Sequence, residues 1–388
     1  MTSAIGNEHA ESAGSMGPLQ GIRIIELGQF LSAPYGGMIL ADLGAQVIKI
    51  EEPTRGDAAR HMGPRFQGGD ALLFRDLNRG KHSVALDFKT EAGLESLLQL
   101  IATADVVISN LRPGIVAQHG IDGSTLTTRF PRLIYCDLSA FGQTGPLSNL
   151  PGFEPLAQAY SGLASVNGTP DGPPLRTGPS IVDMGSGMWI VISALSALRD
   201  RDRTGKGAVI NLSLLDTALA WVTMDISGYL NEGRTPERRA NGHPLLVPYD
   251  AFPALDGPLV IAAGNDAQFA RLAEILGHAE WASQPEYATN AARLQNKRGL
   301  VDHISRIVKE KPREHWAQRL QEAGVPCSGY NTIPEALASA QVEQQGIIRR
   351  SAKTKRQLVG LPFTINGCRP GSIEEAPHIG QDNHLLDS

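Results

Sequence analysis

The sequence has few cysteines, few aromatic residues and no dense run of basic residues. Its 388 residues include 3 cysteines, at positions 136, 327 and 368, and no CxxC pair. Such wide spacing argues against a disulfide framework and a thiolate zinc site, so we expect no metal and a reducing, cytoplasmic location. The formal net charge is -5 and no lysine- or arginine-rich stripe is present, which argues against nucleic-acid binding.

The sequence also lacks a long hydrophobic run. The strongest run, at residues 188–192, is far shorter than the ~20 residues that cross a bilayer. The first residues lack the basic start and the apolar stretch of a signal peptide, and we expect a loose tail over residues 1–17. These features predict a soluble, cytoplasmic protein with no membrane partner.

Apolar, β-branched runs alternate with helical patterns through the first half of the chain. The predicted strands cover residues 22–27, 46–50, 82–88, 105–109, 133–138 and 208–212, and predicted helices cover residues 34–43, 91–103, 183–199 and 214–230. This alternation predicts an α/β fold with a doubly wound, Rossmann-like parallel sheet. No GxGxxG pattern follows the first strand, which disfavours a nicotinamide cofactor.

The composition indicates a second domain. After residue 230 the chain becomes rich in arginine, glutamate, proline and glycine, which is typical of a linker. We predict a large domain over residues 18–230, a linker with a smaller α+β domain over residues 231–324, and a return to the large domain over residues 325–388. Helices are expected there at residues 266–276, 300–309 and 313–323.

Asp183 is the first candidate for chemistry. It lies just before Gly185 and Gly187, at the predicted start of an apolar helix. One interpretation is structural, because aspartate is a preferred N-cap residue. The other is functional: each glycine costs roughly 1 kcal/mol in helix propensity, which is better explained if a ligand approaches the backbone closely. A helix N-terminus also favours a carboxylate and can stabilise an oxyanion nearby.

Several short motifs accompany Asp183 along nearly the whole chain. They are GIRIIEL at residues 21–27, ADLGAQVIKIE at 41–51, NRGK at 78–81, NLRPG at 110–114 and FGQTGP at 141–146. Together with the Asp183 segment they resemble the class III CoA-transferases, the CaiB/BaiF family that includes formyl-CoA transferase and carnitine CoA-transferase.

The resemblance implies a mechanism and a set of ligands. Asp183 would attack an acyl-CoA carbonyl, giving an aspartyl anhydride and then an aspartyl-CoA thioester, with coenzyme A as part of a substrate and no prosthetic group. An ionised carboxylate needs no general base for such an attack. The resemblance also implies an intertwined homodimer. The residues expected to bind CoA, by similarity and by charge, are Phe30, Leu31, Asn78, Arg79, Lys81, Asn110, Leu111 and Arg112.

The acids that exchange CoA are predicted from polar residues. Gln158, His243 and Tyr249 suit a small or dicarboxylic acid such as succinate better than a long apolar chain. His243 lies in a segment that resembles the part of the family covering the acyl end of the site. A single histidine in a turn is also commonly structural, so both interpretations of His243 stay open.

Two other functions are consistent with the sequence. An α-methylacyl-CoA racemase would share the fold, but racemases have a histidine after the glycine that matches Gly152, where this chain has Phe153 and then Glu154. Proton transfer needs an acid and a base on opposite faces of the substrate, and phenylalanine can be neither. A non-catalytic acyl-CoA binding protein, in which Asp183 only caps its helix, is the second alternative.

Overall fold

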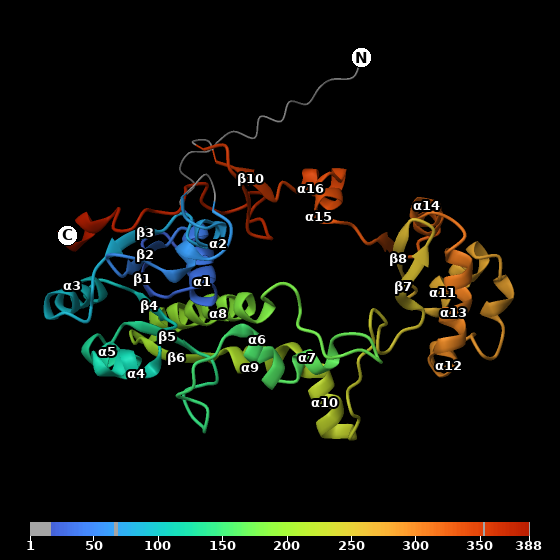
Figure 1. The fold of residues 1–388 in the computed structure, drawn as a ribbon, viewed down its shortest axis with the longest axis horizontal. Coiled ribbons are helices and arrows are strands. Elements are labelled where there is room, and N and C mark those ends of the chain that lie inside the picture. The colour runs from blue at the N-terminus through green and yellow to red at the C-terminus, as the bar shows by residue number, and fades with distance from the viewer. Residues whose placement is uncertain (1–16, 66–68, 352–353, 388) are drawn as a thin grey trace, which may run out of the picture. The chain divides into compact units, whose positions relative to one another are not determined.

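The computed structural model describes residues 17–65, 69–351 and 354–387, which fold into two compact units (Figure 1). The larger unit is built from the described residues up to 163, from residues 176–227 and from residue 346 onward. The smaller unit comprises residues 164–175 and 228–345. These divisions differ from the predicted boundaries at 230 and 324. The chain returns to the larger unit at residue 346 and not at residue 325. The reason is that strand β9 (Cys327–Gly329) pairs with a strand of the smaller unit.

A six-stranded parallel sheet forms the centre of the larger unit, in the order β3-β2-β1-β4-β5-β6. The chain winds outward from β1 to β3 and then starts again at β4, on the other side of β1. This arrangement confirms the predicted α/β fold with a doubly wound sheet. The strands are β1 (Arg23–Leu27), β2 (Gln46–Glu51), β3 (His82–Ala85), β4 (Val106–Ser109), β5 (Ile134–Ser139) and β6 (Ala208–Ser213).

Strand β1 shows how the sheet divides its two faces. Ile25 and Leu27 are buried in an apolar core with residues of helix α3 (Glu91–Ala102). Glu26 points to the opposite face, where helix α1 (Ser32–Asp42) passes so closely that a Cβ on Gly37 would lie 1.9 Å from Glu26 Oε2. Alternate residues of a strand therefore serve two helical layers.

The longest helix of the described residues is α8 (Ile181–Thr204), which contacts α1, β5 and β6. It is long and apolar enough, by length and composition alone, to cross a membrane. Core helices of soluble proteins also pass that test, and the helix as a whole is longer than the apolar run at residues 188–192. The absence of a membrane partner stays a prediction.

The remaining elements of the larger unit are short. Figure 1 shows the C-terminal segment returning beside β3, where Asp382 Oδ2 accepts from Ser83 N at 2.8 Å. These short elements of the larger unit are η1 (Ala58–His61), α2 (Leu72–Leu77), α4 (Pro113–Gln118), α5 (Gly123–Arg129), α6 (Glu154–Tyr160), α7 (Leu163–Val166), α9 (Leu214–Trp221), β10 (Ile348–Arg350), β11 (Gln357–Val359) and η3 (Asn383–Asp387). Helix α7 continues into the smaller unit.

The smaller unit has its own apolar core, which confirms a smaller α+β unit. An antiparallel sheet of β7 (Tyr249–Ala254), β8 (Gly257–Ala262) and β9 packs with helices around buried Phe252, Phe269 and Trp281. Its helices are α10 (Thr223–Glu232), which begins in the larger unit, α11 (Asp266–Ile275), η2 (Ala279–Ala282), α12 (Asn290–Gln295), α13 (Lys297–Val308), α14 (Arg313–Glu322), α15 (Ile333–Leu337) and α16 (Ala340–Gln345).

Candidate active site

Asp183 lies in the first turn of α8 and is not its N-cap. The helix begins at Ile181, and the N-cap residue is Ser180, whose side chain makes no capping hydrogen bond. Asp183 Oδ1 instead accepts a hydrogen bond from the Ser32 hydroxyl, at the first position of α1. The structural interpretation of Asp183 as an N-cap is therefore wrong, because its carboxylate is directed to a neighbouring helix.

The two glycines after Asp183 serve helix packing. A Cβ on Gly187 would lie 2.7 Å from Ser32 O and 3.0 Å from Gly36 N, both backbone atoms of α1. A Cβ on Gly185 would lie 3.0 Å from the Trp221 ring. The expectation that a ligand approaches these glycines is wrong, because protein atoms already fill the space beside them. Gly187 lets α1 approach closely enough for Ser32 to reach Asp183, whereas Gly185 makes room for Trp221 of α9.

Burial raises the pKa of Asp183 from 3.8 to about 6. The hydrogen bond from Ser32 acts against this rise, the Glu154 carboxylate adds to it, and the Arg176 guanidinium lowers it. Both remote groups are thus close enough to act on Asp183 through their charges. With a pKa of about 6, the carboxyl group is mainly ionised at neutral pH and is desolvated, which suits a nucleophile.

A buried polar network connects α6 to the segment that leads into α8. Gln158 Nε2 donates to Glu154 Oε1 and, at 3.0 Å, to Thr177 Oγ1, and Gln158 Oε1 accepts from Thr177 N at 3.0 Å. Arg176 Nε pairs with Glu154 Oε2 at 3.2 Å. Gln158 has no exposed surface, so its visible function is to fix residues 176–177 just before Asp183. The Arg176 side chain is 46% exposed and can meet a ligand.

The loops after β1 and β4 meet where the winding of the sheet reverses. Gln29 N donates to Asn110 Oδ1 and Asn110 Nδ2 donates to Gln29 O, both at 2.9 Å. Ligands of open α/β sheets bind beyond the carboxyl ends of the strands at such a reversal. The structure therefore brings together five of the residues predicted to bind CoA: Phe30, Leu31, Asn110, Leu111 and Arg112.

Phe30 has a backbone φ of 65°, an unusual conformation for a residue with a side chain. Its N–H donates to Asp57 Oδ1 at 3.1 Å, and its ring meets the Phe153 ring edge to face at 5.8 Å. Leu31 follows as the N-cap of α1, and Arg112 is exposed as the N-cap of α4. The loop after β1 is thus fixed by protein contacts at Phe30, two residues before Ser32.

The other three predicted CoA-binding residues lie inside the protein. Arg79 Nη2 pairs with Asp42 Oδ2 at 2.5 Å. Lys81 Nζ pairs with Glu26 Oε2 at 2.7 Å and donates to Asn78 Oδ1 at 2.9 Å. Burial lowers the pKa of Lys81 to about 8, against the opposite effect of the Glu26 carboxylate. In this structure their polar groups stabilise the junction of α1, β1 and β3, and a function in CoA binding stays a prediction.

His243 and Tyr249 belong to the smaller unit, whereas Asp183 and Gln158 belong to the larger one. The His243 and Tyr249 rings stack with centroids 5.0 Å apart, and His243 Nδ1 accepts from Leu245 N at 3.1 Å. These contacts give His243 a structural function in its turn. Contact of either residue with a substrate stays a prediction.

Sequence reasoning missed Ser32 and Arg176. Ser32 is distant from Asp183 in the sequence and reaches it across a helix pair, whereas Arg176 lies in the segment just before α8 and acts on Asp183 through its charge. The pattern Pro34, Gly36 and Gly37 after Ser32 was a usable signal, because small residues at the start of a helix indicate close packing. Among the described residues no group of three or more histidine, cysteine, aspartate or glutamate side chains could hold a metal ion.

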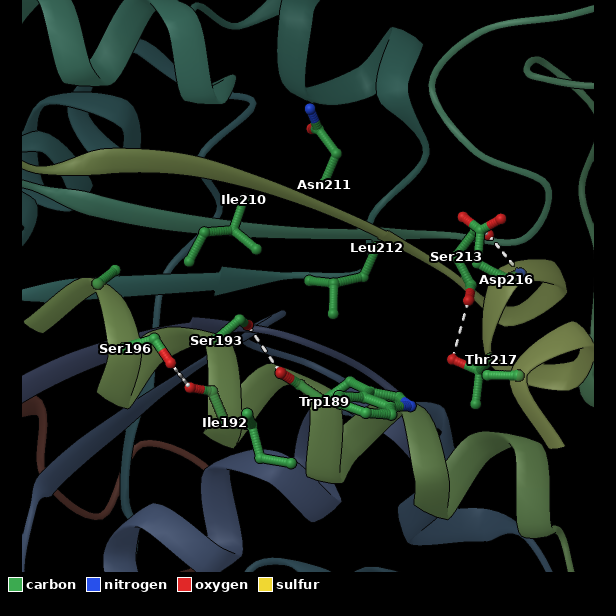
Figure 2. Close-up of a pocket in the computed structure, with 12 residues that line it drawn as sticks. Trp189, Ile192, Ser193, Ser196, Ile210, Asn211, Leu212, Ser213, Asp216 and Thr217 are labelled. Atoms are coloured by element: carbon green, nitrogen blue, oxygen red, sulfur yellow. Dashed lines mark hydrogen bonds between the residues drawn. The ribbon is translucent and has the colours of Figure 1, made fainter. Parts of the chain in front are cut away.

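A pocket of about 650 Å³ lies between α8, β6 and α9 (Figure 2). Figure 2 shows Trp189 and Ile192 of α8 facing Ile210 and Leu212 of β6 across it. Trp189 and Ile192 are 43% and 51% exposed. Large apolar side chains at this exposure are typical of a contact surface.

The chain is similar to several known CoA-transferases. The sequence model of CoA-transferase family III matches residues 19–383. The chain is 37% identical over 376 residues to an acetyl-CoA:oxalate CoA-transferase of Acetobacter aceti, covering 95% of each. It is 38% identical over 336 residues to a succinate–glutarate CoA-transferase of Agrobacterium fabrum, covering 85% of this chain and 84% of the relative.

A solved structure has the same fold. The crystal structure of a CaiB/BaiF family protein from Brucella suis matches with a TM-score of 0.85 and 34% identity, covering 96% of this chain and 98% of that chain. The family match over residues 19–383, the named relatives and this fold show that the chain belongs to CoA-transferase family III, whose members use CoA thioesters as substrates, and is a CoA-transferase.

Proposed function

We propose that Asp183 is the covalent nucleophile that carries CoA from an acyl-CoA donor to a carboxylic acid acceptor. The observation that supports this most directly is a desolvated carboxylate, with a pKa raised to about 6, held by Ser32 in the first turn of α8. The helix N-terminus stabilises negative charge at this position. A nucleophile of this kind is ionised at neutral pH and needs no separate base.

The reaction proceeds in two exchanges. An oxygen of Asp183 attacks the thioester carbonyl, the C–S bond breaks, and CoA leaves as a thiolate with an acyl-aspartyl anhydride left on the enzyme. The thiolate then attacks the aspartyl carbonyl and expels the donor carboxylate, which gives an aspartyl-CoA thioester. The acceptor carboxylate reverses both steps. No proton is consumed, which explains why one carboxylate is sufficient.

We propose that CoA is held by the loops at the sheet reversal, with Phe30, Leu31, Asn110 and Leu111 near the nucleotide. The exposed guanidinium of Arg112 suits a phosphate. Asn78, Arg79 and Lys81 would act through the buried ion pairs that support the loop between β1 and α1. No prosthetic group enters this mechanism.

The proposed acids are small or dicarboxylic acids such as succinate. Two relatives are named for oxalate and for succinate with glutarate. Arg176 supports the same class, because its half-exposed guanidinium acts on Asp183 and can attract a carboxylate. Gln158 would position residues 176–177, and His243 and Tyr249 would contact the acid.

We also propose a cytoplasmic, intertwined homodimer. The apolar side chains of α8 at Met188, Trp189 and Ile192 are all exposed and line or adjoin the pocket of Figure 2. A second copy would remove them from water, which stabilises the assembly at roughly 25 cal/mol for each Å² of apolar surface.

The proposal is tested by incubating the wild-type protein with succinyl-CoA and a panel of acids, with product thioesters separated by chromatography. We expect a new acyl-CoA, ping-pong kinetics, and no turnover by Asp183→Ala. Turnover by Asp183→Ala would contradict the proposal. Exchange of the α-hydrogen of a 2-methylacyl-CoA without transfer would instead favour the racemase alternative, and binding without either reaction would favour the binding protein.

A further inference from the structure

Ser32 and Asp183 face each other across the tightest helix contact of the site. Ser32 is the first residue of α1 and is buried, and its hydroxyl donates to Asp183 Oδ1. One turn further along α8, Gly187 lies against the Ser32 carbonyl, where a Cβ would be only 2.7 Å away. The backbone of Ser32 is thus held between two points of α8, and its hydroxyl has a fixed position relative to Asp183.

This contact makes the two carboxylate oxygens of Asp183 different. Oδ1 accepts from Ser32, whereas Oδ2 has no hydrogen-bond partner within the described part of the chain. An oxygen that already accepts a hydrogen bond is the weaker nucleophile, because part of its electron density is engaged. The geometry therefore selects Oδ2 as the oxygen that attacks.

We propose that Ser32 is a catalytic residue that orients Asp183 for attack through Oδ2 and then stabilises the oxyanion that forms on Oδ1. This inference rests on the proposed function of Asp183. In the second step the CoA thiolate forms an S–Cγ bond to Asp183, and the electron pair of the Cγ–Oδ1 double bond moves to Oδ1. Collapse of that intermediate breaks the bond from Cγ to Oδ2 and releases the donor carboxylate. Ser32 keeps its proton throughout.

Other groups around Asp183 do not serve this function. Glu154 and Arg176 are the charged side chains that influence Asp183, the first raising and the second lowering its pKa. Glu154 is an anion and would oppose an oxyanion on Oδ1. Arg176 pairs with Glu154 at 3.2 Å, whereas the Ser32 hydroxyl already contacts the reacting group. A donor directed at a developing oxyanion contributes about 10²- to 10³-fold to kcat.

The test compares Ser32→Ala with Ser32→Cys, which keeps the shape of the side chain but is a weaker donor. Ser186→Ala is the matched control, because Ser186 is also a buried hydroxyl close to Asp183 on α8 but donates to Thr217 Oγ1 of α9 at 2.8 Å. Each protein is assayed for kcat and KM with succinyl-CoA and an acceptor acid between pH 5 and 9. The acyl-enzyme and CoA-enzyme forms are separated by intact mass after rapid quenching.

We expect Ser32→Ala to lose about 10²-fold in kcat with a smaller change in KM, and Ser32→Cys to lie between it and the wild type. Because the hydrogen bond lowers the pKa of Asp183, the acid limb of the pH profile should move up by about one unit. The anhydride should accumulate, because its conversion to aspartyl-CoA is slowed. Ser186→Ala should lose stability but keep the wild-type kcat and acid limb.

Two results would overturn the proposal, and they are distinguishable. If the wild type transfers CoA and Ser32→Ala behaves like Ser186→Ala in kcat and in pH profile, Ser32 is only structural. If the wild type forms no adduct and transfers no CoA with any acid, the proposed function of Asp183 fails first and this inference fails with it.

Discussion

The packing of α1 against α8 is tested by adding one methyl group at Gly187. In Gly187→Ala the new Cβ would lie 2.7 Å from Ser32 O, 2.9 Å from the Tyr35 ring and 3.0 Å from Gly36 N. Two of these are backbone atoms, so α1 must shift as a unit. Overpacking of this kind costs about 1–3 kcal/mol, and the better helix propensity of alanine returns about 1 kcal/mol. We expect a net loss of up to about 2 kcal/mol in the free energy of unfolding.

Gly114→Ala is the control, because Gly114 lies in helix α4 with no atom within 4 Å of the added Cβ. It should be neutral or stabilising by up to about 1 kcal/mol. Urea denaturation measures both, and the transferase assay should show that Gly187→Ala also lowers kcat by moving Ser32 away from Asp183. Wild-type stability in Gly187→Ala together with lost CoA binding would refute the packing argument and restore a ligand beside Gly187.

Three further predictions concern charge and assembly. Because burial raises the pKa of Asp183 from 3.8 to about 6, the folded protein loses stability as the pH rises through that range. Asp183→Asn should therefore be more stable than the wild type at pH 8, on the order of 1–3 kcal/mol by urea denaturation. The variant should lose this advantage near pH 4. Equal advantages at both pH values would contradict the burial argument. Arg176→Met should raise KM for the acceptor acid about 10- to 100-fold, because a charge-assisted hydrogen bond contributes about 1.5–3 kcal/mol. The KM of Arg176→Lys should lie between those of the wild type and Arg176→Met. An unchanged KM in steady-state kinetics would show that Arg176 does not bind the acid. Ile192→Asp should convert a dimer into a monomer in sedimentation, and a wild-type monomer at micromolar concentration would exclude the dimer.

Much of the fold could be predicted because local patterns determine it. The β-branched runs of β1, β2, β4 and β5 are predictable to within a residue or two, since buried parallel strands are continuous apolar segments. One predicted helix over residues 214–230 is instead two helices, α9 and α10, with a break at Val222. Helical periodicity continues across such a break, and only the backbone conformation reveals it.

The site was predictable only in part, for a related reason. Asp183 was identifiable from its glycines and from family motifs, but Ser32 is 151 positions away in the sequence. Helix propensity correctly indicated that something approaches Gly185 and Gly187, yet it could not show whether the neighbour was a ligand or a helix. Likewise, the NRGK motif at residues 78–81 could not show that Arg79 and Lys81 already have buried carboxylate partners.

The covalent step at Asp183 is tested most directly by mass spectrometry of the intact protein. Wild type and Asp183→Ala would be incubated with succinyl-CoA, quenched with acid, and the peptide that contains Asp183 examined with and without hydroxylamine. We expect an acyl or CoA adduct on that peptide in the wild type, its conversion to a hydroxamate by hydroxylamine, and no adduct in the variant. CoA transfer by the wild type with an unmodified Asp183 peptide at every quench time would contradict the mechanism.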